Sequence, residues 1–163
     1  MEIQILKELF SRDIRKLRDE IAAYNNEEKI WETEKGISNS AGNLCLHLIG
    51  NLNTYIGKEL GHTAYVRNRP LEFSQKGISK TVLLWMIDET HQVVIKTLSS
   101  LDPRKLDDEF PVLVFESPKT IRFMLTHLTT HLTWHLGQIN YHRRLLDHTL
   151  TNLTRRESVV GLN

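Results

Sequence analysis

Apolar positions recur at helical spacing in four long segments of this chain. They cover residues 3–24, about 40–60, about 79–98 and 117 to about 146. In each segment apolar side chains return every three or four residues, and charged or polar side chains occupy the other face. No segment reads securely as a strand. The pattern therefore predicts an all-α fold, an antiparallel four-helix bundle.

Residues that favour helix ends support these boundaries. The run 38–40 offers serine and asparagine N-caps for the second helix, and Gly61 follows its expected end. For the last helix, we expect Ser117 as the N-cap with Pro118 at the first helical position.

Two connections and the C-terminus are read as non-helical. The connection 61–77 holds two glycines, a proline and two arginines, and loops of this length tend to carry function or to pack as a lid. The segment 110–115 has strand-like composition but no partner run, so we expect an extended loop. Residues 1–148 then form one domain, and residues 149–163 form a polar, loosely ordered tail.

Composition narrows the class of protein. The chain has 163 residues, which suits one domain. Its 21 basic and 20 acidic side chains nearly cancel, which argues against a nucleic-acid partner. The single cysteine, Cys45, excludes an internal disulfide framework and fits a reducing compartment. No export signal or membrane-length apolar run is visible, so we expect a cytoplasmic protein without a membrane partner.

Histidines interrupt the apolar stripe of the last helix. His127, His131 and His135 recur every four residues, and His142 follows two turns later. Residues four apart lie on the same helix face, and this face should point to the core. A neutral imidazole buried there needs partners for both ring nitrogens, and a metal ion can be one of them.

The i, i+4 pair His131 and His135 is spaced to bind one ion from one helix. Two ligands rarely complete a site. His47, on or beside the apolar stripe of the second helix, is the best third candidate. Three imidazoles leave coordination positions for water or substrate, which is the pattern of a catalytic metal site.

Ordinary alternatives remain open for these side chains. A histidine on an apolar face is often a core residue bonded to a carbonyl or hydroxyl group. His127 can be a ligand, a support for a ligand or an exposed residue, and we favour the last two. His142 lies about 10 Å along the helix axis from His135, which is too far to bind the same ion.

Gly137 and Gln138, which follow His135, are also informative. Gly137 sits inside the helix, where it costs about 1 kcal/mol relative to alanine, so we expect a close helix contact there. Gln138 lies three residues after His135, and its amide can reach the rim of the same site or be an ordinary exposed side chain.

Two motifs resemble those of the DinB-like proteins, a family that includes the YfiT type and thiol-dependent transferases. One is a mid-helix histidine followed by a small and an amide residue, here His47 with Gly50 and Asn51. The other is H-x-x-x-H-x-G-Q, here residues 131–138. The order of helices is similar too, so the resemblance covers about residues 1–148.

The resemblance implies a four-helix bundle with a divalent ion, commonly nickel or zinc, on His47, His131 and His135. It also implies a homodimer and, for some members, transfer or isomerisation that uses a low-molecular-weight thiol. At Trp134 and Leu136, where many relatives have a histidine and an arginine, this chain departs from the family. The departure leaves the ligands intact and bears on any shared substrate contact.

Two functions follow as hypotheses. The first is a metal-dependent, thiol-dependent transferase or hydrolase, in which the ion lowers the pKa of a bound thiol or water. Its small-molecule substrate would enter under the 61–77 connection, where Arg67 and Arg69 either hold a carboxylate or are simply solvated. The second is a non-enzymatic metal-binding or stress-associated module. A fourth protein ligand would favour the module, and an open cavity would favour the enzyme.

Overall fold

The computed structural model describes residues 2–147, and over this range it contains helices and no strand longer than one isolated bridge. The all-α class predicted from the sequence is confirmed. The α-helices are α1 (Glu2–Ala22), α2 (Ala41–Leu52), α3 (Arg69–Ser74), α4 (Lys80–Ser100) and α5 (Ile121–Leu146). Two 3-10 helices, η1 (Glu27–Trp31) and η3 (Pro103–Asp107), and a π-helix, η2 (Asn53–Lys58), complete the helical segments. None of the helices in this range is long and apolar enough to cross a membrane.

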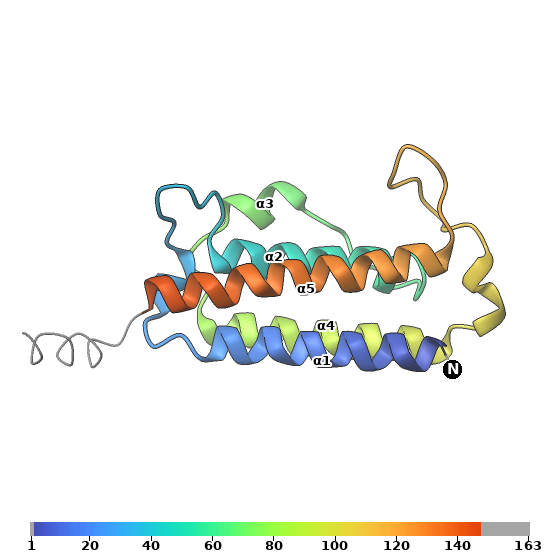
Figure 1. Cartoon of the computed structure of the whole chain (residues 1–163), viewed down its shortest axis with the longest axis horizontal. Helices are drawn as coiled ribbons and strands as arrows, with labels where there is room; N and C mark the ends of the chain where they lie inside the picture. The colour runs from blue at the N-terminus through green and yellow to red at the C-terminus, as the bar shows by residue number, and fades with distance from the viewer. Residues whose placement is uncertain (1, 148–163) are drawn as a thin grey trace, which may run out of the picture.

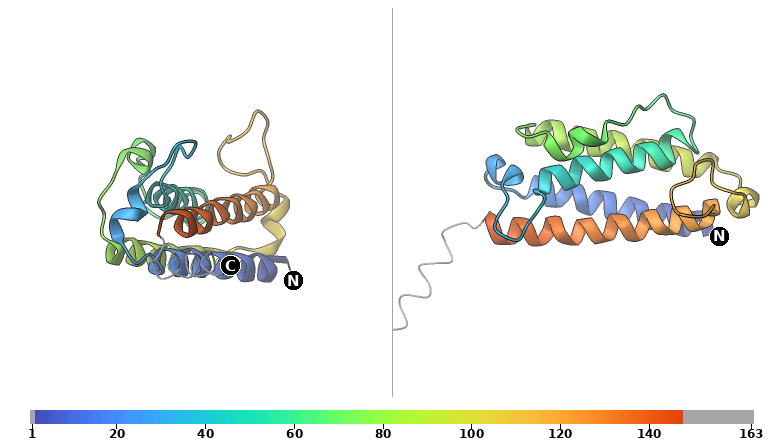
Figure 2. Two further views of the ribbon diagram at one scale, coloured as in Figure 1. Left: turned by 60° about the vertical axis from the view of Figure 1, so that its left-hand side comes forward. Right: turned by 90° about the horizontal axis from the view of Figure 1, so that it is seen from above.

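The long helices form two layers, with α1 and α4 in one and α2 and α5 in the other (Figure 1). α1 packs on α4 and α5, while α2 packs on α5 and α4. α1 and α5 run in one direction and α2 and α4 in the opposite direction (Figure 1). The short α3 covers the outer side of α2 (Figure 2).

α2 is the central helix for the site because all its residues are buried. α1 and α5, in contrast, bury one face and expose the other, as amphipathic helices on a core do. Ser40 caps α2 by accepting a hydrogen bond from the backbone N–H of Asn43, which agrees with the expected start. A polar side chain on α2, such as His47, therefore points into protein wherever it faces.

The connection between α2 and α4 contains a helix that the sequence did not predict. α3 begins after Asn68, whose side chain accepts from the backbone N–H of Leu71. The amide of Asn43 on α2 donates to the carbonyls of Glu72 and Gln75, at 3.0 and 2.8 Å. These two bonds fasten α3 to the buried helix.

The expected start of the last helix is wrong. α5 begins at Ile121, and Thr120 is its N-cap. The preceding residues are held extended because the N–H of Phe110 donates to the carbonyl of Lys119, and the N–H of Ile121 donates to the carbonyl of Asp108. Segment 110–115 is a loop, as predicted. The expected tail, 149–163, lies outside the described residues.

Candidate metal centre

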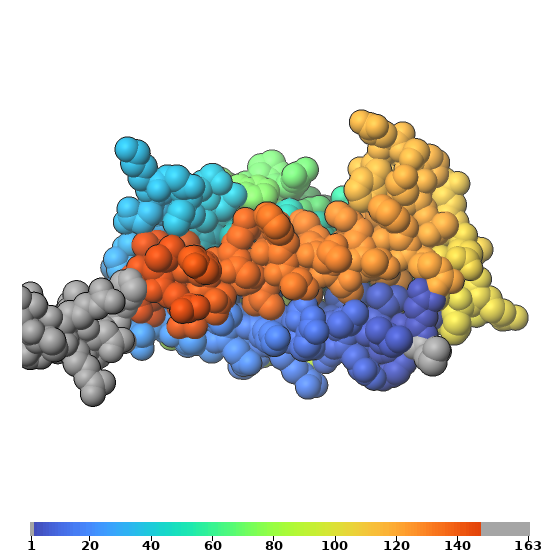
Figure 3. Space-filling model, in the orientation of Figure 1, coloured from blue at the N-terminus to red at the C-terminus, as the bar shows by residue number. Residues whose placement is uncertain are grey.

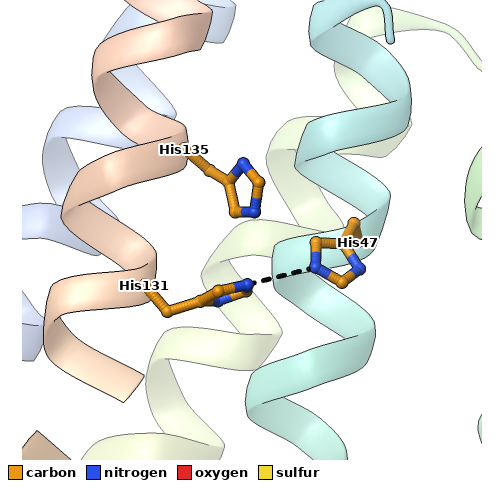
Figure 4. Close-up of side chains that lie close together, drawn as sticks. All are labelled: His47, His131 and His135. Carbon is orange, nitrogen blue, oxygen red and sulfur yellow. Dashed lines mark hydrogen bonds between the residues drawn. The ribbon is translucent and has the colours of Figure 1, made fainter. Parts of the chain in front are cut away.

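Three histidines from two helices meet between α2 and α5. His47 comes from α2, and His131 and His135 come from successive turns of α5 (Figure 4). Each offers one ring nitrogen, and these atoms all lie within 4.8 Å of one another. The structure thus brings together the three residues that the sequence singled out, while their role as ligands stays a prediction.

The geometry fits a single small ion. The Nε2 atoms of His47 and His131 are 3.3 Å apart. Two imidazole nitrogens that bind one tetrahedral zinc ion at roughly 2.0–2.1 Å are separated by about 3.3–3.4 Å. The ring of His135 lies 4.6 Å from that of His131 and 5.2 Å from that of His47, centroid to centroid. Small side-chain adjustments would therefore suffice for the three ring nitrogens to coordinate one ion.

Hydrogen bonds on the outer side orient two of the rings. Nδ1 of His47 lies 3.0 Å from Oε2 of Glu72, and Nδ1 of His135 lies 2.7 Å from Oε1 of Gln138. Both oxygens accept from an Nδ1–H, which places the free lone pair on Nε2. Gln138 therefore reaches the rim of the site, which is the first of the two interpretations given for it above.

Glu72 is the residue that sequence reasoning missed. Its carboxylate is buried and accepts from Nε and Nη2 of Arg67, at 2.6 and 2.9 Å. A Cβ on Gly50 would lie 2.2 Å from its Oε1, so glycine at this position makes room for the carboxylate. The signal in the sequence was this small residue, Gly50, one turn after His47, but nothing there identified its partner.

Burial favours the neutral form of His47 and His131. Burial lowers the pKa of His47, and the bond to Glu72 only partly opposes that shift. Burial, followed by the nearby His135 and His47, lowers the pKa of His131 to about 4. The neutral imidazole is the form that binds a metal ion.

A cavity opens beside the histidines. It has a volume of about 250 Å³ and is lined by His47, His131 and side chains from α5, η2 and the 61–77 connection. The surface dips here, between the raised segment before α5 and the green segment of α3 (Figure 3). Among residues 2–147, no cysteine, aspartate, glutamate or further histidine joins the three as a fourth ligand. An ion on them would face the cavity.

The neighbouring histidines differ from the three. His127 lines the same cavity, and its ring centroid is 5.9 Å from that of His131, but it is not among the grouped side chains. His142 is buried, and Nδ1 lies 2.7 Å from the hydroxyl of Tyr24 while Nε2 lies 2.9 Å from the carbonyl of Glu32. Both its ring nitrogens are occupied, as in an ordinary core histidine.

The structure also shows the surroundings of Arg67, Arg69 and Gly137. Arg67 is half-buried and paired with Glu72, so it is not a solvated loop residue. Arg69 is exposed, lines the cavity and forms no ion pair within residues 2–147. A close helix contact at Gly137 is not found within residues 2–147, because no described atom lies within 4 Å of an added Cβ. Gly137 is on the exposed side of α5.

Comparisons with known proteins agree with the fold. The model of a family described as a protein of unknown function (DUF1572) matches residues 3–154. A solved structure described as the conserved protein of locus from Enterococcus faecalis is similar, with a TM-score of 0.69 and 18% sequence identity over 88% of this chain and 95% of that chain. At this identity the likeness shows the fold alone. No curated protein matches the chain.

Proposed function

The chain belongs to the DUF1572 family of proteins of unknown function, and we propose that it binds one divalent metal ion on His47, His131 and His135 and uses it in chemistry on a small molecule. The observation that carries the proposal is that the three ring nitrogens converge and that two of the histidines, His47 and His131, line a cavity. Three-histidine sites with an open position are typical of catalytic metal centres.

The reaction class that we propose is transfer or hydrolysis that depends on the metal and, for transfer, on a low-molecular-weight thiol. A bound zinc or nickel ion would supply Lewis acidity that lowers the pKa of a thiol or water in its open position. The protein supplies the holding groups. Glu72 and Gln138 orient His47 and His135 through Nδ1, and the Arg67 guanidinium balances the charge of Glu72 behind the site.

The finer classification is also a proposal. The H-x-x-x-H-x-G-Q run at residues 131–138 and the helix-borne His47 support membership of the DinB-like bundles, as does the packing of four long helices in two layers. On the same resemblance we propose a homodimer, and on the single cysteine, Cys45, we propose a cytoplasmic location.

Cobalt substitution tests whether the site has an open position. We expect the cobalt-loaded protein to give a thiolate-to-metal absorption band when 2-mercaptoethanol is added, because a thiolate can take the free coordination position. Turnover assays with thiols and electrophilic small molecules would follow. A cobalt spectrum that no thiol changes would contradict the thiol-dependent enzyme and favour a non-enzymatic metal-binding or stress-associated module.

A further inference from the structure

The cavity beside the three histidines carries an unbalanced positive charge. Its lining includes Arg67 and Arg69, and no aspartate or glutamate of the described chain lines it. The charge of Arg67 is neutralised by its ion pair with Glu72. Arg69 has no such partner within residues 2–147, so its charge is available at the cavity. With a divalent ion on the three histidines, the field inside the cavity favours an anion.

Asn51 brings a second, independent feature to the same cavity. It lies one helical turn after His47, is only 9% exposed and lines the cavity. Its Oδ1 is buried without a hydrogen-bond partner in the described chain. Leaving a buried polar group unpaired is unfavourable, so this position favours a ligand that donates a hydrogen bond.

The remaining lining sets the size and character of the ligand. Met124, Leu128 and Val114 give the cavity an apolar wall. Its volume of about 250 Å³ is below the range of roughly 300–1,000 Å³ for pockets that hold drug-sized ligands. A small metabolite with a short apolar body fits these limits.

Together these features identify a ligand class. We propose that the cavity binds a small hydroxycarboxylate whose carboxylate pairs with Arg69 and whose hydroxyl donates to Oδ1 of Asn51. A hydroxyl group can donate to Oδ1 of Asn51 without adding positive charge, whereas an ammonium group would be repelled by Arg69 and by the ion. This inference rests on the proposed metal site and adds the substrate class to it. The apolar body lies against the wall formed by Met124 and Leu128.

Calorimetric titration of the zinc-loaded protein with three matched compounds tests each contact. The compounds are the hydroxy-acid analogue of leucine, its amide, and isocaproate, which lacks the hydroxyl group. We expect the hydroxy acid to bind at least about 10-fold more tightly than the amide, because a charge-assisted hydrogen bond is stronger than one between neutral groups. We also expect it to bind more tightly than isocaproate.

Two variants assign these preferences to residues. Arg69→Gln should remove the preference for the acid over the amide, and Asn51→Leu should remove the preference for the hydroxy acid over isocaproate. Asn51→Leu should not lower the melting temperature, because it loses no hydrogen bond. Arg15→Gln, at an exposed arginine of α1, is the matched control and should change neither preference.

Zinc content, measured on the same samples, separates the possible failures. If zinc is stoichiometric and the hydroxy acid binds no better than its amide and isocaproate, the ligand class is wrong and the metal site stands. Equal effects of Arg69→Gln and Arg15→Gln would contradict the assignment of the carboxylate to Arg69. If the parent holds no zinc, both the metal site and the ligand class are wrong.

Discussion

Two parts of α5 carry histidines on the same face of one helix and use them differently. Toward the C-terminus, both ring nitrogens of His142 are bonded, to Tyr24 and to the carbonyl of Glu32. Two turns earlier, Nδ1 of His135 is bonded to Gln138, and the other nitrogen turns toward His131 and His47. The spacing of the histidines along α5 places them on one face in both parts, so spacing alone does not distinguish the two uses.

What separates them is the neighbouring element. Opposite His142, Tyr24 just after α1 presents a hydroxyl group and Glu32 just after η1 presents a carbonyl group. These two groups occupy both ring nitrogens of His142, so no metal ion is needed there. Opposite His131 and His135, α2 presents another imidazole. Three neutral imidazoles can bond only partly to one another, so they are left with lone pairs for an ion.

The largest expected effect is on metal binding. We expect His131→Ala and His135→Ala each to abolish stoichiometric binding of zinc or nickel, because two imidazoles rarely make a site. His142→Ala should retain full binding. Elemental analysis of protein purified without a metal-affinity tag measures this. Full occupancy of the double variant His131→Ala, His135→Ala would refute the ligand assignment.

The reverse pattern is expected for stability. His142→Ala should lower the free energy of unfolding by about 1–3 kcal/mol, because it leaves the buried hydroxyl of Tyr24 without its partner. Urea unfolding of the metal-free protein measures the loss. His135→Ala, at a partly exposed position, should cost less. Equal destabilisation by the two variants would mean that the two parts of α5 do not differ as described.

Glu72 tests whether orientation of His47 matters to the site. Replacement of residues that support metal ligands typically weakens binding by about 10–100-fold, and we expect Glu72→Gln to fall in this range. Competition with a chelator of known affinity gives the number. Glu34→Gln, at an exposed acid, is the control, and a Glu72→Gln affinity equal to that of this control would rule out the orienting role.

The pH dependence of the metal-free protein gives a smaller effect. The folded pKa of His131 is about 4, below the ordinary value near 6.5, so the unfolded chain binds more protons between these values. Stability should therefore decrease as pH falls from about 6.5 to about 4. Replacing His131 by glutamine should flatten this decrease. Urea unfolding at several pH values measures it, and an unchanged slope would contradict the lowered pKa of the partly buried His131.

The long helices and the ligand candidates could be predicted because both depend on periodic positions within single segments. The helix 79–98 expected from its pattern is α4, Lys80–Ser100. α3 has six residues, too few for a periodic pattern, and it is held by side-chain bonds from Asn43 on α2. Such bonds join residues about thirty positions apart and leave no local signal.

The same limit explains Glu72 and the start of α5. Glu72 reaches His47 only because α3 packs on α2 over the space left by Gly50. Pro118 after Ser117 is a sound local start signal, but the backbone bonds of Phe110 and Ile121 override it. The convergence of His47 on the α5 pair was predictable from residue type and face, while the cavity beside them needed the tertiary arrangement.

The most direct test of the central claim is an X-ray absorption spectrum of the zinc-loaded parent protein. We predict three imidazole nitrogens and one exchangeable oxygen ligand at roughly 2.0–2.1 Å, with the imidazole scattering reduced in His131→Ala but unchanged in His142→Ala. A spectrum dominated by carboxylate or sulfur ligands, or one that His131→Ala leaves unchanged, would contradict a metal centre on His47, His131 and His135.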